Sequence, residues 1–363
     1  MRDNGKPRVL HIVPALFGTD GVLGGAERYA LELARHMANS VPTRLLTFGT
    51  ESRYETFGNL TVRVVGDPWY VRGQQSNPIS TAILGESGRA DVVHCHQQHI
   101  LSSSLAAAFS KISGRKVFVT DLGGGGWDVS AYINTDRWYD GHLHISEFSR
   151  KVFGQEKQPW SYVILGGVDT DKFSPDPKVE SDASVLFVGR LLPHKGINYL
   201  IEAAPKELPV NIIGRPMHEQ YMRELQALAE GKRINFHHDY SDEQIVQAYR
   251  SALCIVLPSV FRTMHGDETP VPELLGQTLL EGMACGIPAI CTNVASMPEI
   301  VEDGRSGFIV PPNDAEALHE KFVWLNEHRD EAKNMGRNAR ARVLETFTWP
   351  RVVERCLEIY TRA

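Results

Sequence analysis

Short apolar runs alternate with amphipathic stretches along the chain. In the first half, β-strands are predicted at residues 9–15, 44–48, 61–65, 91–96, 116–120, 142–146 and 162–165. Runs that are apolar at nearly every position are typical of strands buried on both faces, as in parallel sheets. Residues 26–37 carry an apolar stripe at helical spacing, and residues 103–112 and 147–153 also predict helices. This alternation predicts a parallel α/β sheet with helices on both faces.

The same alternation starts again after a Pro-rich polar segment at 175–182, which predicts a domain boundary. Strands are predicted at 185–188, 210–213, 234–237, 254–258 and 289–292, and helices at 197–204 and from Gly276 onward. A chain of 363 residues suits two domains of about 150–180 residues each. We therefore expect two α/β domains, at 1–168 and 169–346, and an amphipathic last helix at 347–363.

Composition narrows the class of protein. Hydrophobic residues make up 42% and charged residues 23% of the chain, as in a soluble globular protein. The five cysteines are scattered, which favours a reducing, cytoplasmic setting. The polar start does not predict a signal peptide, and no apolar run approaches the ~20 residues of a membrane span.

The net charge of −6 divides unevenly between the two halves. Residues 1–168 hold 17 Lys and Arg against 15 Asp and Glu, whereas the rest holds 21 against 29. This balance does not describe a nucleic-acid binder. The slightly basic first half leaves peripheral attachment at the inner face of a membrane open.

Two acids flank a predicted helix start. Glu273 precedes Gly276, an apolar run containing Glu281 follows, and Gly286 with Pro288 ends the helix. Eight helical steps span about 12 Å, the scale of a nucleotide-sugar from its sugar to its ribose. The first-turn amides lie between the acids, where a phosphate is favoured. A core helix with two solvated acids is the simpler explanation of the spacing alone.

Two other segments combine a strand end, glycine and a helix start. Gly24 and Gly25 precede the helix at 26–37, so amides and the helix dipole favour an anion there. Arg190 and Lys195 follow the strand at 185–188 and predict a phosphate clamp. An ordinary flexible loop and a pair of surface charges are the alternatives.

The sequence motifs that contain these residues resemble those of glycosyltransferase family 4. The resemblance rests on Glu-x7-Glu leading into Cys-Gly-x-Pro at 273–288, on M-P-E-I-V-E-D-G-R-S-G-F-I-V-P-P-N-D at 297–314, and on G-R-x-x-x-x-K-G at 189–196. It covers nearly the whole chain, strongly from 163 to 314 and more weakly before. Gly166 stands where the family usually has Asn before Gly-Val-Asp.

The resemblance implies a GT-B fold, with two Rossmann-like parallel-sheet domains facing across a cleft and the last helix packed back on domain 1–168. It implies retaining transfer of a sugar from a nucleoside diphosphate sugar, UDP first and GDP next, to the hydroxyl of a sugar, lipid-linked or small-molecule acceptor. Domain 169–346 would bind the donor, with its base near 236–240, and no metal or other cofactor is required. Segments 120–128 and 261–272 receive no role.

Individual residues inherit expected roles from the resemblance. His96 and Glu273 are expected to contact the sugar and to be catalytic. Donor contacts are expected at nine residues: Gly24, Gly25, Arg190, Lys195, Leu275, Gly276, Gln277, Thr278 and Glu281.

Two other functions remain open on the sequence. His94 and His96 share a strand face, and His99 could return as a third zinc ligand, as in metallo-β-lactamase-type hydrolases. Gln98 stands where that motif has an acid, and a histidine packed at a strand end is the plainer interpretation. A sugar-nucleotide-binding protein without turnover is the other alternative, which the intact Glu273 and Glu281 pair disfavours.

Overall fold

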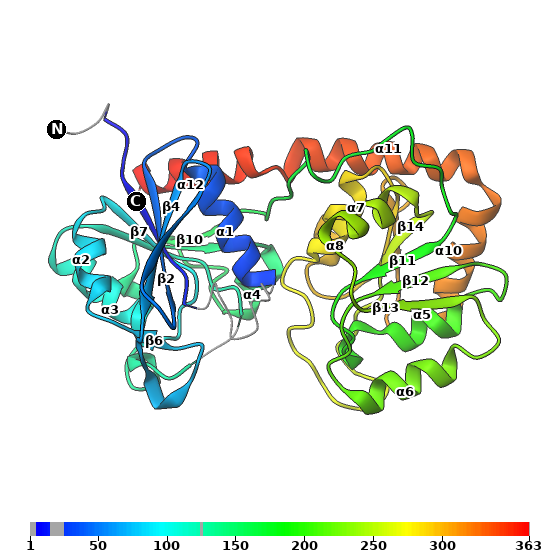
Figure 1. Cartoon of the computed structure of the whole chain (residues 1–363), viewed down its shortest axis with the longest axis horizontal. Helices are drawn as coiled ribbons and strands as arrows, with labels where there is room; N and C mark the ends of the chain where they lie inside the picture. Colours follow the sequence, from blue (N-terminus) through cyan, green and yellow to red (C-terminus); the bar gives the residue numbers. More distant parts are fainter. Residues whose placement is uncertain (1–4, 15–24, 124–125, 363) are drawn as a thin grey trace. The chain divides into compact units, whose positions relative to one another are not determined.

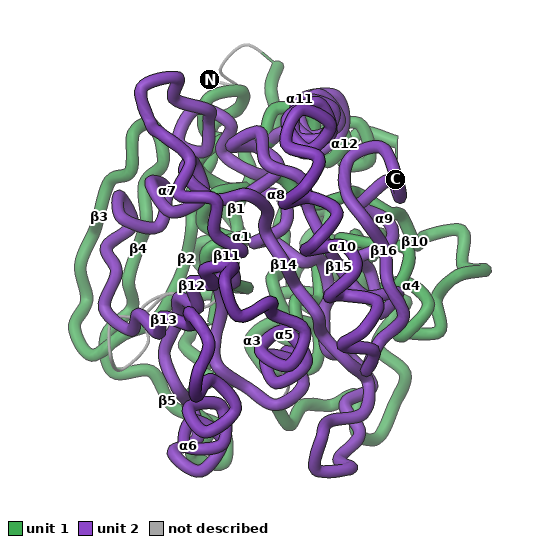
Figure 2. The backbone as a smooth tube through the Cα atoms, turned by 90° about the vertical axis from the view of Figure 1, so that its right-hand side faces the viewer, with its two compact units in different colours: residues 1–167, 349–363 green, residues 168–348 purple. Residues whose placement is uncertain are grey.

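The chain forms two compact units. A computed structural model describes residues 5–14, 25–123 and 126–362. The first unit comprises residues 1–167 with 349–363, and the second comprises 168–348 (Figure 2). These limits differ by one or two residues from the expected 1–168, 169–346 and 347–363.

An eight-stranded sheet organises the first unit, in the order β10-β9-β8-β7-β1-β2-β4-β3. Its strands are β1 (Val9–Ile12), β2 (Thr43–Gly49), β3 (Arg53–Phe57), β4 (Leu60–Gly66), β7 (Val92–Cys95), β8 (Lys116–Val119), β9 (Gly141–His144) and β10 (Ser161–Val163). All neighbours pair in parallel except β3, which is antiparallel to β4. A separate antiparallel pair joins β5 (Trp69–Tyr70) and β6 (Pro78–Ile79).

Helices cover both faces of this sheet because its central strands are apolar on both sides. The helices are α1 (Gly25–Met37), α2 (Ala82–Gly88), α3 (Leu101–Ile112), α4 (Glu147–Val152) and α12 (Trp349–Arg362), with 3-10 turns at Val71–Gly73, Val129–Ala131 and Asp136–Trp138 (Figure 1). Leu45 packs in one core cluster with Ala30 of α1, whereas its neighbour Leu46 packs in another with Ala106 of α3. Successive strand residues point to opposite faces, so each face receives its own core.

The second unit contains a wholly parallel six-stranded sheet, in the order β13-β12-β11-β14-β15-β16. Its strands are β11 (Val185–Val188), β12 (Val210–Ile213), β13 (Ile234–His237), β14 (Cys254–Leu257), β15 (Ala289–Thr292) and β16 (Gly307–Val310). Its helices are η4 (Pro193–Lys195), α5 (Ile197–Ala203), α6 (Glu219–Leu228), α7 (Asp242–Ser251), α8 (Gln277–Ala284), α9 (Met297–Ile300), α10 (Ala315–Glu327) and α11 (Arg329–Thr346).

Each sheet has one point at which the strand order reverses. In the first unit the chain runs outward from β1 through β2 and then restarts on the other side of β1 with β7. In the second unit it runs outward from β11 and restarts on the other side with β14. In open α/β sheets, ligands bind at the carboxyl ends of strands beside such a reversal. The topology therefore indicates where to look for a site in each unit.

Candidate functional site

In the second unit, expected site residues from two segments lie at the carboxyl ends of β11 and β14. Arg190 and Lys195 follow β11, and Glu273 precedes α8, the helix between β14 and β15 (Figure 1). The reversal of strand order lies between these two strands. The site predicted from sequence thus coincides with the position that the topology indicates.

The loop that carries Lys195 is fixed against β14. Gly196 has φ +67°, and a Cβ built on it would lie 2.0 Å from the carbonyl oxygen of Pro258. Only glycine combines this left-handed conformation with such a close approach. The amide of Val260 donates to the carbonyl oxygen of His194 at 2.8 Å and ties the same loop to the chain after β14.

Lys195 and Glu273 form an ion pair that is largely withdrawn from water. The ammonium donates to Oε1 of Glu273, and only 13% and 11% of the two side chains are exposed. The hydroxyl of Ser259 donates to the same carboxylate oxygen at 3.0 Å. A lysine and a carboxylate, expected to act on different parts of the ligand, are therefore in direct contact.

The loop after β11 carries three basic residues: Arg190, His194 and Lys195. Arg190 is exposed immediately after β11. The pKa of His194 is lowered to about 4, first by burial and next by Lys195, while Glu273 opposes the shift. His194 is therefore neutral near pH 7, which leaves Arg190 and Lys195 as the cations of this loop.

Helix α8 begins where the sequence predicts. Gly276 is its N-cap in the left-handed region, with φ +80° and ψ 48°. The first-turn amides at 276–278 therefore lie close in sequence to Glu273 and point out of the helix start, where an anion is favoured. Leu275 is buried just before the cap.

Glu281 lies inside α8 and is only 4% exposed. The hydroxyl of Tyr249, on α7, donates to its Oε2 at 2.8 Å. Sequence reasoning missed Tyr249, although its position on the buried face of an amphipathic helix was a usable signal. The expected contact of Glu281 with a ribose remains a prediction.

In the first unit, His96 belongs to a buried cluster with His11 and His94. His94 on β7 is in register with His11 on β1, and the three rings are 0–4% exposed. Nδ1 of His11 lies 2.8 Å from Nε2 of His96, and the His94 and His96 ring centroids are 4.4 Å apart. Sequence reasoning missed His11, although the pairing of β1 with β7 would have revealed it.

The expected grouping of His94, His96 and His99 is wrong. Nδ1 of His99 pairs with Oγ of Ser130 at 3.0 Å, and His11 takes the third position beside His94 and His96. His99 is displaced because it follows β7 by four residues, beyond the strand face that carries the other two.

The glycine-rich turn after β1 is only partly described. Gly24 lies outside the described residues. Gly25 is the first residue of α1 and is exposed, and a Cβ built on it meets no atom within 4 Å. Thr120, at the start of the second glycine-rich segment, contacts Nε2 of His94 at 2.8 Å.

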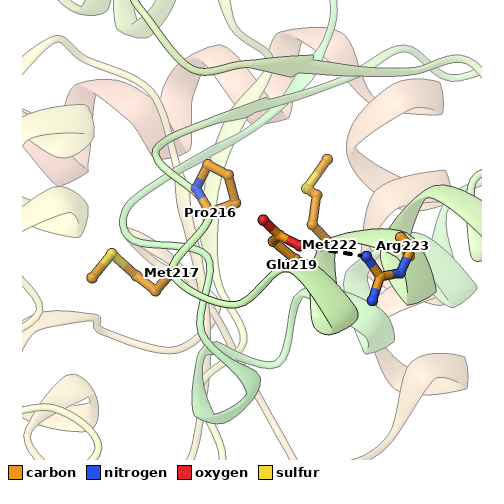
Figure 3. Close-up of a pocket in the computed structure, with 5 residues that line it drawn as sticks. All are labelled: Pro216, Met217, Glu219, Met222 and Arg223. Carbon is orange, nitrogen blue, oxygen red and sulfur yellow. Dashed lines mark ion pairs between the residues drawn. The ribbon is translucent and has the colours of Figure 1, made fainter.

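A small cavity of about 260 Å³ adjoins the loop that carries Lys195, because Leu191 of that loop pairs with Pro216. It is lined by Pro216, Met217, Glu219, Met222 and Arg223, at the start of α6 (Figure 3). None of its lining residues belongs to the expected donor set. We therefore define the candidate site by the side chains around Lys195 and Glu273 rather than by this hollow.

Comparison with known proteins identifies relatives. The family model for glycosyl transferases group 1 matches residues 168–342. The chain is 30% identical to D-inositol 3-phosphate glycosyltransferase of Geodermatophilus obscurus, over 94% of this chain and 86% of that protein. It is 29% identical to α-maltose-1-phosphate synthase of Mycolicibacterium smegmatis, over 66% of this chain and 68% of that protein. It spans about half the length of several other relatives that it matches.

Solved structures agree on the architecture. The Anabaena protein HepE in complex with UDP and glucose superimposes with a TM-score of 0.75 at 18% identity, over 98% of this chain and all of that one. The structural neighbours are GT-B glycosyltransferases, which confirms the expected fold class. In the described part of the chain, no helix is both long enough and apolar enough to span a membrane.

Proposed function

This chain belongs to the group 1 glycosyl transferases, and from that premise we propose that it moves a sugar from a nucleoside diphosphate sugar to an acceptor hydroxyl, with retention of the α configuration. The observation that carries the proposal is the contact between Lys195 and Glu273 beside the start of α8. This contact brings a cation, a carboxylate and the amides of a helix start together at the carboxyl ends of the parallel strands.

Cleavage of the glycosyl–phosphate bond leaves negative charge on the diphosphate. Lys195, Arg190 and the first-turn amides at 276–278 would stabilise that charge, because preorganised donors act strongly where water is excluded. The phosphate would compete with Glu273 for Lys195. Binding of the donor would therefore release the carboxylate for the sugar. Cations and a helix start supply the charge that a metal ion supplies elsewhere, so the proposed reaction requires no metal.

Positive charge develops on the sugar in the same step. Glu273, still held by Ser259, would orient the sugar hydroxyls and support that charge. Glu281, held by Tyr249, would accept from the ribose diol, and His96 would contact the sugar. Gly24, Gly25 and Leu275 complete the proposed donor contacts.

We favour a UDP-sugar, with a GDP-sugar next, and an acceptor that is a sugar, a lipid-linked saccharide or a small molecule. HepE, with UDP and glucose bound, supports this order for the donor. Thermal shift with UDP, GDP and ADP separates the bases, since a ligand at about 100 times its Kd adds about 2.7 kcal/mol to the free energy of unfolding. The anomeric configuration of the product, measured by NMR, tests retention.

Replacing Lys195 tests the site directly. Lys195→Met should weaken binding of the preferred nucleoside diphosphate about 10- to 100-fold, because a hydrogen bond to a charged group contributes about 1.5–3 kcal/mol. Isothermal titration measures this Kd. Lys172→Met is the matched control, since Lys172 pairs with Asp242 at the surface of the same unit. Wild-type affinity in Lys195→Met would contradict the proposed site.

A further inference from the structure

The buried histidine cluster of the first unit has a fixed direction of hydrogen bonding. Nε2 of His11 lies 3.3 Å from the sulfur of Met37, the last residue of α1. A thioether sulfur can accept a hydrogen bond but cannot donate one. The contact therefore requires the proton of His11 to be on Nε2.

The imidazole rings of His11 and His96 are both neutral near pH 7. Burial lowers the pKa of His11 to about 3 and the pKa of His96 well below its usual value. A neutral imidazole has one donor and one acceptor nitrogen, so Nδ1 of His11 is an acceptor. Nε2 of His96 lies 2.8 Å from it and must therefore carry the proton of His96.

This arrangement leaves Nδ1 of His96 with a lone pair. Among the described residues, this nitrogen is buried and has no hydrogen-bond partner. His96 itself is 4% exposed, at the carboxyl end of β7 beside the reversal of strand order. A buried polar atom without a partner is costly, so a group that supplies a hydrogen there is bound favourably.

We propose that Met37 and His11 are positioning residues that fix the tautomer of His96, so that its Nδ1 accepts a hydrogen bond from a hydroxyl group of the bound ligand. The assignment of that hydroxyl to the donor sugar rests on the proposed function. The tautomer itself does not. The class of ligand group is set by the chemistry, because an acceptor nitrogen selects a donor such as a hydroxyl and disfavours a phosphate or carboxylate oxygen.

A metal ion is the competing explanation of three clustered histidines, and the distances disfavour it. Two imidazole nitrogens bound at about 2.0–2.1 Å to a tetrahedral zinc ion are about 3.3 Å apart. Nδ1 of His11 and Nε2 of His96 are 2.8 Å apart, which is a hydrogen-bond distance. Both nitrogens of His94 are also engaged, with Tyr360 at 2.7 Å and Thr120 at 2.8 Å.

The decisive measurement is the tautomer of His96 in the ligand-free protein, by long-range ¹H–¹⁵N NMR of ¹⁵N-histidine-labelled samples. We expect a single Nε2–H form in the wild type. Met37→Leu keeps the volume but removes the acceptor, so a mixture of tautomers should appear at His11 and His96. His11→Leu should have the same effect on His96, whereas His11→Asn can present a carbonyl oxygen in place of Nδ1 and should restore the Nε2–H form. Met335→Leu, at a buried methionine of the second unit, should change nothing.

Kinetics provide the second readout. Met37→Leu should lower kcat about 2- to 10-fold, the effect of one neutral hydrogen bond, with KM for the acceptor unchanged. An Nδ1–H form in the wild type, or an unchanged tautomer in both Met37→Leu and His11→Leu, overturns the proposal. Stoichiometric zinc in the purified protein also overturns it. If the wild type transfers no sugar yet shows the expected tautomers, the proposed function fails while the roles of Met37 and His11 stand.

Discussion

At the scale of single residues, Lys195 and Glu273 compensate each other's charge in a largely dry environment. Losing one member of such a pair leaves the other charge without its partner, which is strongly destabilising. A bound diphosphate can replace Glu273 as the partner of Lys195. On the proposed function, the ion pair would be the arrangement of the ligand-free site, and the bound diphosphate would open it.

Glu273→Gln separates binding from catalysis. Lys195 loses its competing carboxylate, so the nucleoside diphosphate should bind at least as tightly as in the wild type. The rate of sugar transfer should fall roughly 10²- to 10³-fold, the loss typical of one group that stabilises a transition state. Titration of the nucleotide and a transfer assay on one sample measure both. Weaker nucleotide binding would place Glu273 on the diphosphate side instead.

Glu281→Gln, by contrast, should weaken binding of the nucleotide. The amide preserves the contact with Tyr249 but removes the charge that the ribose diol would use, so the Kd for the nucleotide should rise about 10-fold or more. The melting temperature should change little, since the shape and the hydrogen bond remain. An unchanged Kd would show that Glu281 serves only the core.

The sequence pattern identified Lys195, Glu273 and Glu281 but not their partners. The contact between Lys195 and Glu273 joins residues 78 positions apart, and no local pattern predicts it. Ser259 was missed for the same reason, because it reaches Glu273 from another element. The pattern of α7 could have predicted that Tyr249 is buried, but not that it contacts Glu281. Local spacing predicts which residues lie at a strand end, whereas the pairing of side chains depends on the order of strands.

At the scale of elements, the loop from β11 to α5 is held in one conformation. Gly196→Ala places a methyl group against the carbonyl of Pro258 and also strains a left-handed residue, so the loop must move and carry Lys195 with it. We expect a loss of unfolding free energy greater than the ~1–2 kcal/mol of the conformation alone, together with weaker nucleotide binding. Chemical denaturation measures the stability.

Gly231→Ala provides the matched control. Gly231 has φ +74° in the same unit, but no atom lies within 4 Å of a built Cβ. Gly231→Ala should therefore lower the free energy of unfolding only by the cost of the left-handed conformation. Its affinity for the nucleotide should be unchanged. Equal losses in the two variants would show that the approach to Pro258 is relieved without moving the loop.

The buried central parallel strands and α8 were predictable, whereas the partly buried parallel strand β16 at the edge of the second sheet was missed. Edge strand β3 was missed as well. Its residues are exposed or partly buried, so Arg53–Phe57 lacks the apolar signal that identified the central strands. Exposed, charged edges of this kind are usual where a sheet must not pair with another chain.

At the scale of the whole molecule, the two units should differ in their response to acid. Burial lowers the pKa of His11 to about 3 and those of His142 and His144 to about 4, and all three lie in the first unit. Because the unfolded chain binds protons first, below about pH 6.5, stability is lost as the pH falls toward the folded-state values. At pH 5, each of these histidines lowers the free energy of unfolding by about 2 kcal/mol relative to neutral pH.

Hydrogen exchange at pH 7 and pH 5, corrected for intrinsic rates, tests this difference. Peptides from β7 and β9 should lose protection at pH 5, whereas β14, in the second unit, should lose less. In the second unit, the half-buried His194 has a comparably lowered pKa. Equal losses in both sheets would show that these histidines do not control the acid response.

The last helix has a consequence for the order in which the protein is made. Helix α12 belongs to the first unit, where Trp349 packs edge-on to Tyr29 at 5.2 Å and Tyr360 reaches His94. The whole second unit, residues 168–348, is translated in between. At usual synthesis rates this takes on the order of 10–40 s. During that time, the surface of the first unit against which α12 packs is exposed. The part that leaves the ribosome first is therefore the last to be completed.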